Sequence, residues 1–580
     1  MDKLRLWAPE AEQVFAMVDG QKFKMIQAEG GLWETPSEIA EHGTSYRFSV
    51  NGMDFFPDPA SCWQPEGIHG PSRYLDHSLF QWTDSSWQCP PLGSAVIYEM
   101  HIGTFSPEGT FEGAVKYLDY LAETGITHLE IMPVNSFPGQ WGWGYDGVGL
   151  YAPHEPYGGP QKFKELVDQC HSRGLAVILD VVYNHLGPEG NYLGKFAPYF
   201  SDKYSSPWGE GVNLDGPFSD GVRSFFIENA LMWLQDYHVD GLRLDAVHAF
   251  VDMSATHFLE ELAENVKRLE VTSGQRHFLI AESDLNDPGI IRSSDRGGYG
   301  IDAQWSDDLH HSLHALITGE RQDYYSDFGK VSQVAKALKN SFVFDGTYSH
   351  FRKRKHGRPP SGLPGYSFVA SLQNHDQVGN RAFGERIGHL CDPRLQMSAA
   401  ALVFTSPFLP MIFQGEEWAA SSPFCYFTDF SDEELAEMVR KGRKSEFSSF
   451  SEIEKDIPDP GAKDTFCRSK LNWNEKDQGL HSKMLSWYRN LIKIRKDNPC
   501  LLDGNRENIK VEFSEGKKWI LIKRKYIITT CNFSKTRSLI NVPGIYSGSK
   551  IILESVKGTR MQENSILLPP LCTAVIRTGL

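Results

Sequence analysis

The sequence predicts an α/β fold, a (β/α)8 TIM barrel with one β-sandwich before it and a second β-sandwich after it. Two observations support the barrel: eight short apolar runs recur along the middle of the chain, and segments with helical periodicity, such as KFKELVDQCHSRG, separate most of them. Continuous apolar runs are typical of strands buried on both faces, as in a parallel sheet. Short strand-like runs between turn clusters at both ends of the chain predict the two sandwiches.

The N-terminal region alternates short apolar runs with turn residues, as in LRLWAP, VFAMVDG and YRFSVNG. This spacing is typical of a small β-sandwich. The content of proline and glycine rises around Gln88–Gly93, which indicates the end of this unit. We therefore predict a first domain over residues 1–92.

The barrel is predicted over residues 93–498, with a short inserted subdomain around residues 183–218, where Gly, Pro, Ser and Tyr are frequent. Eight strand–helix units over about 400 residues fit a (β/α)8 barrel with long insertions. A doubly wound sheet is the alternative, but no G-x-G-x-x-G motif follows a strand. The predicted strands are Ala95–Met100, His128–Met132, Ala176–Val182, Gly241–Leu244, Phe278–Ala281, Ala303–Trp305, Phe368–Leu372 and Pro410–Phe413.

The C-terminal region begins after the helical segment LHSKMLSWYRNLIKIRK. From there the chain returns to short strand-like runs, KWILIKRKYIITTCNF and SKIILES. We therefore predict a C-terminal β-sandwich over residues 499–580. The segment FSSFSEIEKDIPDPG at 447–461, which precedes that helix, is predicted to be an exposed loop.

The composition of the 580 residues excludes several classes of protein. Asp and Glu number 74 against 58 Lys and Arg, the net charge is −16, and no long basic stripe occurs, so we expect no nucleic-acid partner. No apolar stretch is long enough to span a membrane and no apolar leader opens the chain, so we expect no membrane partner. Nine scattered cysteines without a C-x-x-C pair predict free thiols. We expect a cytoplasmic protein and favour a monomer.

Polar residues follow the ends of four predicted strands, where barrel enzymes place their functional groups. The motifs are DVVYNH (180–185), GLRLDAVH (241–248), AESD (281–284) and QNHDQ (373–377). Three carboxylates from separate strands, Asp245, Glu282 and Asp376, are thus expected at one rim of the barrel. Paired carboxylates at such a rim, with aromatic residues nearby, are what glycoside hydrolysis requires.

The neighbours of these carboxylates predict their roles. Arg243 lies two residues before Asp245 on the same strand, so its guanidinium should keep Asp245 ionised, as a nucleophile requires. Glu282 follows the apolar run FLIA, where a carboxyl group can be partly desolvated and keep its proton. We therefore predict Asp245 as the nucleophile and Glu282 as the general acid/base.

Other interpretations of these residues stay open at this point. An aspartate at a strand end is often a helix cap, and an Arg-x-Asp pair is often structural. His185, His248 and His375 could suggest a zinc site, but no H-E-x-x-H or comparable spacing supports one. The aromatic run Trp141–Gly147 could stack sugars or pack a long loop. We predict no metal and no cofactor.

The four motifs resemble, in the same order, the four signature regions of the α-amylase family of glycoside hydrolases. The resemblance covers nearly the whole chain, including an N-terminal sandwich similar to a glucan-binding module. It implies that Asp245 is the nucleophile, Glu282 the general acid/base and Asp376 the third carboxylate, which holds sugar hydroxyl groups. It also implies a set of substrate-binding residues, to which we add two from the same motifs: Arg243, His185, His375, Tyr145 and Asp146, with His248 and Asn184.

The family's calcium site uses an asparagine that matches Asn184, with further ligands in the inserted segment. In this chain the insert is short and its acidic residues show no ligand pattern. We therefore predict no required metal.

Longer stretches, IYEMHIGTFSPEGTF, WGWGYDGVGLYAPHEPYGGP and LQNHDQVGNRAFGER, are similar to one subfamily. The resemblance implies a retaining hydrolase whose substrates are maltooligosyl trehalose and related α-glucans. It cleaves the α-1,4-glucosidic bond next to the terminal trehalose, as a step of trehalose formation from glucans. We expect the rim loops Tyr145–Tyr157 and His350–Gly365 to recognise the trehalose unit. The alternatives are a glycogen branching or debranching enzyme of the same family and a non-catalytic glucan-binding protein.

Overall fold

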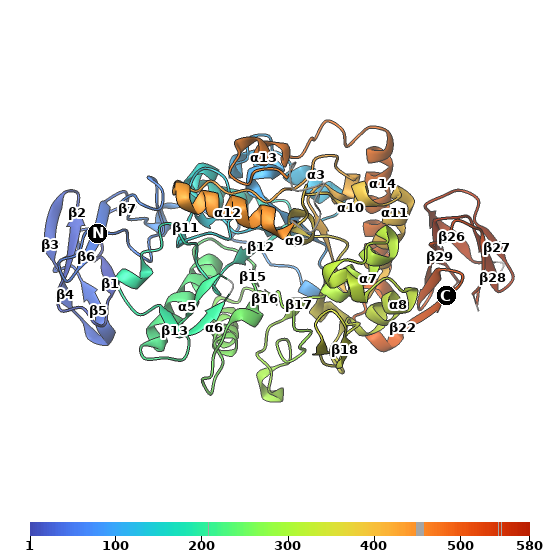
Figure 1. The fold of residues 1–580 in the computed structure, drawn as a ribbon, viewed down its shortest axis with the longest axis horizontal. Coiled ribbons are helices and arrows are strands. Elements are labelled where there is room, and N and C mark those ends of the chain that lie inside the picture. The colour runs from blue at the N-terminus through green and yellow to red at the C-terminus, as the bar shows by residue number, and fades with distance from the viewer. Residues whose placement is uncertain (207, 448–456, 543, 547, 580) are drawn as a thin grey trace.

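The structure of the protein is a computed structural model that describes residues 1–206, 208–447, 457–542, 544–546 and 548–579. Figure 1 shows an elongated molecule with the N-terminal strands at one end, a barrel in the middle and the C-terminal strands at the other end. This arrangement confirms the predicted fold class. Residues 448–456 of the predicted exposed loop lie outside the described residues.

The barrel strands are β8 (Ile97–Met100), β9 (His128–Ile131), β12 (Ala176–Val181), β15 (Gly241–Leu244), β16 (Phe278–Ala281), β17 (Ala303–Trp305), β20 (Phe368–Ser371) and β21 (Leu409–Phe413). They are parallel and close in the order β12-β15-β16-β17-β20-β21-β8-β9. Each predicted apolar run forms one of them, with ends that differ by at most two residues. All residues of these strands are buried, which explains why they form continuous apolar runs.

Helices cover the outside of the barrel (Figure 1). Their apolar residues recur every three to four positions, as at Phe163, Leu166 and Cys170 of α4 (Gly159–His171), which are all buried. The fully described connection from β16 to β17 contains only a short 3-10 helix at Ser294–Arg296. The remaining helices are α1 (Ile102–Phe105), α2 (Phe111–Val115), α3 (Leu118–Thr124), α5 (Ser219–Gln235), α6 (Phe258–Ser273), α7 (Asp307–Thr318), α8 (Val331–Asn340), α9 (His375–Gly379), α10 (Ile387–Leu390), α11 (Pro393–Thr405), α12 (Glu433–Glu446), α13 (Lys463–Arg468), α14 (Gly479–Asp497) and α15 (Pro499–Leu502).

The barrel interior changes from apolar to ionisable side chains along the strands. Side chains alternate between the interior and the helix layer, so residues two apart on a strand share one side. Near the strand starts, Ile97 and Ile178 belong to an apolar interior cluster. Further along the strands the interior carries a buried set that we call the ionisable layer: Glu99, Glu130, Asp180 and Arg243. The open end of the barrel therefore rests on buried ionisable groups.

Short hairpins stand in the barrel loops: β10 (Asn135–Ser136) with β11 (Gly149–Pro153), β13 (Phe200–Ser206) with β14 (Gly209–Val212), and β18 (Thr347–Ser349) with β19 (Arg354–His356). The second of these lies within the predicted insert around residues 183–218. In the third hairpin, β19 lies within the predicted rim loop His350–Gly365, and β18 lies just before that loop. The connections after the strands thus carry structure of their own.

The terminal strands are β1 (Arg5–Trp7), β2 (Val14–Val18), β3 (Gln21–Lys24), β4 (Ile26–Gln27), β5 (Leu32–Glu34), β6 (Ser45–Val50), β7 (Ser72–Arg73), β22 (Ile509–Ser514), β23 (Trp519–Arg524), β24 (Ile527–Asn532), β25 (Ser538–Asn541), β26 (Lys550–Glu554), β27 (Arg560–Gln562), β28 (Ser565–Leu568) and β29 (Cys572–Arg577). The N-terminal strands form sheets β1-β5-β4 and β3-β2-β6-β7 around Trp33 and Phe48. The C-terminal strands form sheets β22-β23-β24-β29-β26 and β25-β28-β27 around Ile528 and Ile566. The exact domain boundaries after residues 92 and 498 stay predictions.

A buried histidine fastens the segment between β7 and β8 to the N-terminal ends of the barrel strands. His171, at the end of α4, bonds Asp84 through Nδ1 at 2.8 Å and Asp240 through Nε2 at 3.0 Å. Trp87 stacks on its ring and donates its Nε1–H to Asp240 at 2.8 Å. Burial lowers the pKa of His171, but the bonds to Asp240 and Asp84 outweigh burial and raise it to about 9. We call these four residues the lower histidine cluster.

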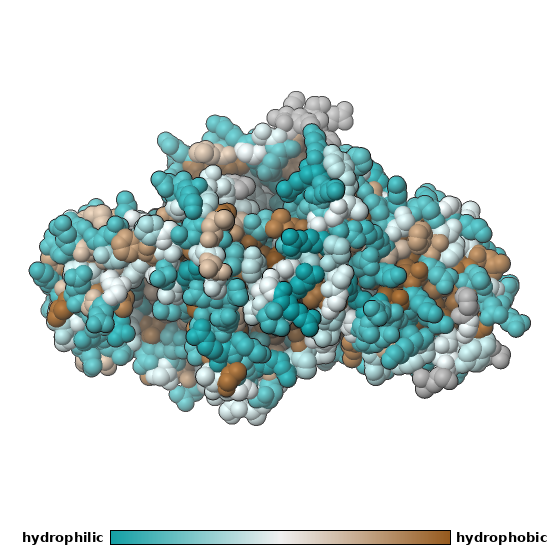
Figure 2. Space-filling view, turned by 90° about the horizontal axis from the view of Figure 1, so that it is seen from below, coloured by the Kyte–Doolittle hydropathy of each residue, from teal (hydrophilic) through white to brown (hydrophobic). Residues whose placement is uncertain are grey.

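The face seen in Figure 2 is mostly hydrophilic, and its hydrophobic residues occur in small groups between polar ones. Two of the large hydrophobic side chains that are exposed, Trp208 and Phe351, line the main cavity of the molecule. Within the described ranges, no helix is both long and apolar enough to cross a membrane.

Candidate active site

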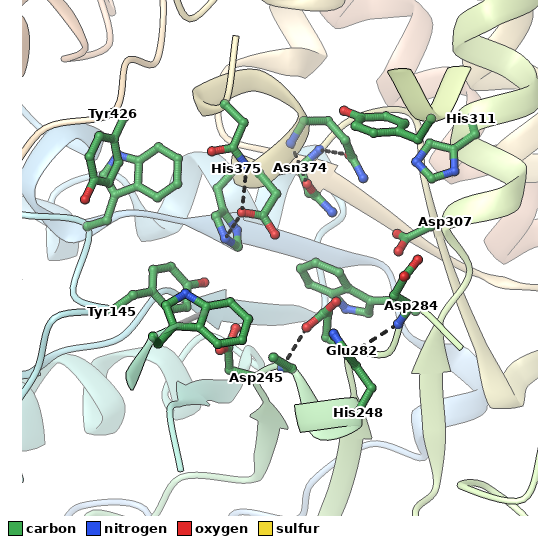
Figure 3. Close-up of a pocket in the computed structure, with 18 of the residues that line it drawn as sticks. Tyr145, Asp245, His248, Glu282, Asp284, Asp307, His311, Asn374, His375 and Tyr426 are labelled. Atoms are coloured by element: carbon green, nitrogen blue, oxygen red, sulfur yellow. Dashed lines mark hydrogen bonds and ion pairs between the residues drawn. The ribbon is translucent and has the colours of Figure 1, made fainter. Parts of the chain in front are cut away.

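A cavity of about 570 Å³ opens at the C-terminal ends of the barrel strands (Figure 3). Six carboxyl groups line it: Asp146, Asp245, Glu282, Asp284, Asp307 and Asp376. Of the described lining residues only Arg352 carries a fixed positive charge, and its guanidinium is bound to Asp284. Aromatic rings, among them Trp143 and Trp305, form much of the remaining wall. Such a cavity suits a neutral sugar that develops positive charge during a reaction.

Asp245 stands directly after β15, where its backbone N–H still bonds the carbonyl oxygen of Val181 at 3.1 Å. Its Oδ1 accepts a hydrogen bond of 2.7 Å from Nη1 of Arg243, whose side chain is completely buried. The same Nη1 lies 2.9 Å from both carboxylate oxygens of Asp180. The guanidinium also lies over the ring of Trp305, with Cζ 4.3 Å from the ring centroid. The carboxylate of Asp245 is therefore bound to a buried and rigidly held cation.

Glu282 stands directly after β16, and its backbone N–H bonds the carbonyl oxygen of Leu244 at 3.0 Å. Its Oε2 accepts a hydrogen bond of 2.6 Å from the backbone N–H of Ala246. Ala246 adopts a positive φ of 40°, a strained turn that directs this N–H at Glu282. Burial raises the pKa of Glu282 to about 8, with Arg243 opposing and Asp245 reinforcing the change. Glu282 therefore holds a proton near neutral pH.

Asp376 and His375 begin the short helix α9 after β20, and Asn374 caps its first turn. The side chain of Asp376 is 45% exposed, against 13% for Asp245 and 14% for Glu282. Nε2 of His375 lies 3.4 Å from Oδ1 of Asp376. The start of this helix therefore presents an imidazole ring and an accessible carboxylate side by side to the cavity.

The other predicted substrate contacts come from loops. Tyr145 stacks on the ring of His375 with 5.1 Å between centroids, and its hydroxyl donates to Asp180 at 2.6 Å. Nε2 of His185 lies 3.2 Å from the carbonyl oxygen of Tyr145, and its ring stacks on Trp208. Two further predicted contacts also line the cavity, Asp146 and His248.

Two predicted residues do not line the cavity. Arg243 lies beneath its floor and reaches Asp245 from there. Asn184 lines a separate small cavity beside Tyr204 and Phe250, and neither atom of its amide has a hydrogen-bond partner among the described residues. Asn184 therefore lines a different cavity from most of the other predicted substrate contacts.

The small cavity at Asn184 does not suit calcium either. None of the described residues that line it is a carboxylate, whereas calcium prefers several carboxylate oxygens. The described part of the chain also holds no group of three or more His, Cys, Asp or Glu side chains placed to bind a metal ion.

The two rim loops predicted to recognise the leaving sugar contribute unequally. The loop Tyr145–Tyr157 places only its first two residues in the cavity, whereas its later tyrosines are buried in the hydrophobic core. The loop His350–Gly365 contributes Phe351 and Arg352. Nη1 of Arg352 donates to Oδ2 of Asp284 at 2.7 Å, and Nη2 binds the other carboxylate oxygen.

Among the lining residues that the sequence-based prediction does not name are Asp307, His311, Tyr324 and Tyr426. Asp307 and His311 lie one turn apart on α7, directly after β17, and both face the cavity (Figure 3). Burial, reinforced by Asp284 and Asp376, raises the pKa of Asp307 to about 7. The rule used for the other strands identifies Asp307 when it is applied to the sixth strand, and His311 follows one helical turn later. Tyr324 and Tyr426 follow no strand end, so no local signal marks them.

Known proteins share this sequence and this architecture. Residues 71–206 match the family model described as alpha amylase, catalytic domain. The chain is 45% identical to the malto-oligosyltrehalose trehalohydrolase of Saccharolobus solfataricus over 94% of this chain and 93% of that protein. It is 47% identical to the malto-oligosyltrehalose trehalohydrolase of Arthrobacter ramosus over 85% of this chain and 87% of that protein.

A crystal structure from Salmonella typhimurium, of a chain assigned as an alpha amylase, matches with a TM-score of 0.91. The two sequences are 36% identical, and the match covers 99% of this chain and 97% of that chain. The match therefore extends over the barrel and both sets of terminal sheets. The chain belongs to the malto-oligosyltrehalose trehalohydrolase family, glycosidases that contain the alpha-amylase catalytic domain.

Proposed function

We propose that the protein is a retaining glycoside hydrolase that cleaves the α-1,4-glucosidic bond next to the terminal trehalose of maltooligosyl trehalose. The products are trehalose and a maltooligosaccharide. The convergence of Asp245, Glu282 and Asp376 from three strand ends on one acidic cavity carries the proposal. The name shared by the relatives above supports the choice of substrate.

In the first half of the reaction, Asp245 attacks the anomeric carbon of the glucose unit bound above it. A bond forms between its carboxylate oxygen and that carbon, the bond to the glycosidic oxygen breaks, and Glu282 gives its proton to that oxygen. Trehalose then leaves as a neutral sugar. The proton is available because the pKa of Glu282 is raised to about 8. Arg243, 2.7 Å from Asp245, balances the charge of the nucleophile before the attack.

In the second half, a water molecule takes the place of trehalose. Glu282, now a carboxylate, removes a proton from this water while the water oxygen attacks the anomeric carbon and the bond to Asp245 breaks. Two inversions give net retention of configuration. The hydrogen bond from the N–H of Ala246 holds the carboxyl group of Glu282 in one orientation for both halves.

The glucose unit that becomes attached to Asp245 is assigned to the side of the cavity with Tyr145, which Figure 3 shows apart from Asp284 and Asp307. Tyr145 offers an aromatic face for the sugar ring, and the exposed carboxylate of Asp376 can accept hydrogen bonds from sugar hydroxyl groups. His185 and His375 offer ring nitrogens to the same unit, and Asp146 completes this side.

The leaving trehalose is assigned to the opposite side of the cavity. Phe351 offers an aromatic ring there, and the bonded pair of Arg352 and Asp284 offers fixed donors and acceptors for hydroxyl groups. His248 lies on the same side, close to Asp284, whose backbone N–H is 3.5 Å from its Nδ1. The loop His350–Gly365 is therefore the better supported of the two predicted recognition loops.

Product analysis by chromatography tests the proposal, with maltopentaosyl trehalose, maltohexaose and an α-1,6-branched dextrin as parallel substrates. We expect release of trehalose in preference to every other cleavage, and proton NMR should show the α-configuration retained at the new reducing end. New branches or debranched chains, with little trehalose, would identify a branching or debranching enzyme instead. Binding of maltodextrin without turnover of any substrate would identify a non-catalytic glucan-binding protein.

We also propose that the protein acts as a monomer in the cytoplasm. All nine cysteines are free thiols, which suits a reducing compartment. The mostly hydrophilic face in Figure 2 suits a monomer. Cell fractionation and light scattering on the purified protein test the two statements, and a membrane-bound or oligomeric form would contradict them.

A further inference from the structure

Both ring nitrogens of His375 face a carboxylate. Below the cavity, Nδ1 lies 2.5 Å from Oε1 of Glu99, and the backbone N–H of His375 donates to Oε2 of the same carboxylate at 3.0 Å. Toward the cavity, Nε2 lies 3.4 Å from Oδ1 of Asp376. A ring nitrogen that faces a carboxylate favours a hydrogen over a lone pair. The geometry therefore favours a ring with hydrogens on both nitrogens, which carries a positive charge.

Glu99 holds His375 from a position that a substrate cannot reach. Its side chain is 1% exposed and belongs to the ionisable layer. Glu130 is its direct neighbour in register on β9, yet neither carboxyl oxygen of Glu130 has a hydrogen-bond partner among the described residues. Burial and the nearby Glu99 raise the pKa of Glu130 well above its ordinary value, so Glu130 is neutral. Of these two adjacent buried glutamates, only Glu99 therefore has hydrogen-bond partners among the described residues.

We propose that Glu99 is a positioning residue that orients the ring of His375 and keeps it as an imidazolium. In this state Nε2–H is a charged donor to a sugar hydroxyl group and the ion-pair partner of Asp376. The inference rests on the proposed function of the cavity and adds a buried residue to it. Aromatic neighbours fix the plane of the ring: Tyr145 stacks on it at 5.1 Å, and Trp143 and Trp305 approach it at 5.7 Å and 6.2 Å between centroids.

Several titratable or charged groups face His375 from the elements around it: Glu99, Glu130, Asp180, Arg243, His101, Tyr145 and Asp376. Burial lowers the pKa of His375, but Asp376 and Glu99 outweigh burial and Arg243, and raise it to about 9. The pKa of Glu282 is about 8. His375 is therefore charged near neutral pH, where Glu282 also holds its proton.

The variant Glu99→Gln separates the charge of His375 from its orientation. The glutamine carbonyl can still accept from the backbone N–H of His375, while its amide N–H donates to Nδ1. Nδ1 then carries the lone pair, Nε2 keeps its hydrogen and the ring becomes neutral. We expect kcat for trehalose release to fall about 10- to 100-fold at neutral pH, because a charged donor is replaced by a neutral one. KM should change less than kcat.

The pH profile gives a readout that a purely structural role would not change. In Glu99→Gln, activity should fall with rising pH at a lower pH than in the wild type, because His375 loses its charge earlier without Glu99. In the wild type, activity should not fall until the higher pH at which Glu282 loses its proton. Glu130→Gln is the matched control, because it replaces a neutral group of the same layer by a neutral group of the same shape. It should keep the wild-type kcat and pH profile.

Proton–nitrogen correlation spectra of the full chain, labelled at histidine nitrogens, report the state of His375 directly, with His375→Gln for assignment. We expect both ring nitrogens to be protonated at pH 7.5 in the wild type and in Glu130→Gln, and a neutral ring in Glu99→Gln. A neutral ring in the wild type would overturn the inference. So would a neutral ring in Glu99→Gln together with wild-type kcat and pH profile, or equal losses in both glutamine variants.

Failure of the proposed function would look different. If the wild type released no trehalose, the spectra would still decide whether Glu99 keeps His375 charged. The kinetic comparison of Glu99→Gln with Glu130→Gln would then use whichever α-glucan the wild type cleaves. With no turnover at all, the role in hydrolysis is overturned.

Discussion

Two buried histidines lie between pairs of carboxylates, one at each end of the barrel. At the N-terminal ends of the strands, His171 lies between Asp84 and Asp240. At the C-terminal ends, His375 lies between Glu99 and Asp376. In both cases the carboxylates outweigh burial and raise the pKa of the histidine to about 9.

The two arrangements differ in how far their carboxylates are exposed. Asp84 and Asp240 are each 5% exposed, so the lower histidine cluster is closed and its charges can act only on the fold. Asp376 is 45% exposed, so one of the two carboxylates around His375 can exchange its contacts for those of a sugar. We propose that the same electrostatic arrangement stabilises the structure where it is closed and serves binding and catalysis where one member stays open.

The largest effect is expected from Asp245→Asn, which changes only the C-terminal ends of the barrel strands. The amide cannot form the covalent intermediate, so kcat should fall by about four orders of magnitude or more. The thermal midpoint should stay close to that of the wild type, because Asp180 still pairs with the buried Arg243. Trehalose release and thermal unfolding are the measurements, and Asp119→Asn, at an exposed carboxylate of α3, is the control that should change neither. Near-wild-type activity of Asp245→Asn would contradict its role as nucleophile.

Glu282→Gln is expected to reduce kcat on maltooligosyl trehalose by about 10²- to 10⁴-fold, the usual range for a general acid. The loss should be much smaller on an aryl α-maltooligoside with a good leaving group, which departs without a proton. In the wild type, kcat on the natural substrate should fall as pH rises through about 8, where Glu282 loses its proton. Equal losses on the two substrates would rule out the acid role.

Asp84→Asn is expected to break the lower histidine cluster and leave the C-terminal ends of the barrel strands unchanged. Removing one partner of a buried ion pair costs about 3–5 kcal/mol of stability, so the thermal midpoint should drop clearly. The kcat per folded molecule should not change. His238→Gln is a graded control, because His238 also bonds Asp84 but is 34% exposed and should cost less. A lower kcat of Asp84→Asn, measured at a temperature at which the variant is fully folded, would show that the two ends of the barrel are coupled.

The smallest effect is a dependence of stability on pH. The pKa of His171 is about 9 in the fold and about 6.5 when unfolded, so its contribution is complete below pH 6.5 and is lost as pH rises through 9. The difference corresponds to about 3 kcal/mol. Thermal midpoints between pH 6 and 10 should fall less in His171→Gln than in the wild type. His375 titrates in the same window, so a residual slope should remain in that variant. Parallel curves would show that His171 does not contribute.

Much of the barrel could be predicted because its strands are buried on every side and therefore form apolar runs. The position of the three carboxylates at the cavity could be predicted because Asp245 and Glu282 follow such runs directly and Asp376 follows within the same motif as the end of its strand. Glu99 could not, because it lies inside the run IYEM, and only the closed barrel brings it under His375. Asn184 shows the reverse limit: it adjoins His185 in one motif, but the two side chains line different cavities.

Asp307 and His311 show a third case. The rule that functional residues follow the ends of barrel strands applies to them, but the alternation of strands and helices is interrupted before their strand. They follow β17, the strand before which no α-helix intervenes, so the alternation of strands and helices is weakest at this point. A helical spacing of four residues brings both side chains to the cavity wall only because α7 starts directly at the strand end. The side of the cavity assigned to the leaving trehalose is therefore harder to predict from the sequence than the side assigned to the sugar that Asp245 attacks.

A wall with six carboxyl groups, against the paired guanidinium of Arg352 and the ring of His375, has a consequence for inhibition. Sugars are uncharged, so such a field contributes little to holding the substrate, and positive charge appears only while the glycosidic bond breaks. A sugar-shaped amine carries that charge permanently. Its inhibition constant should be lower than that of the neutral sugar of the same shape, and added salt should weaken the amine alone. Tighter binding of a basic amino sugar than of the neutral sugar would therefore distinguish this cavity from a glucan-binding groove that lacks these acidic groups.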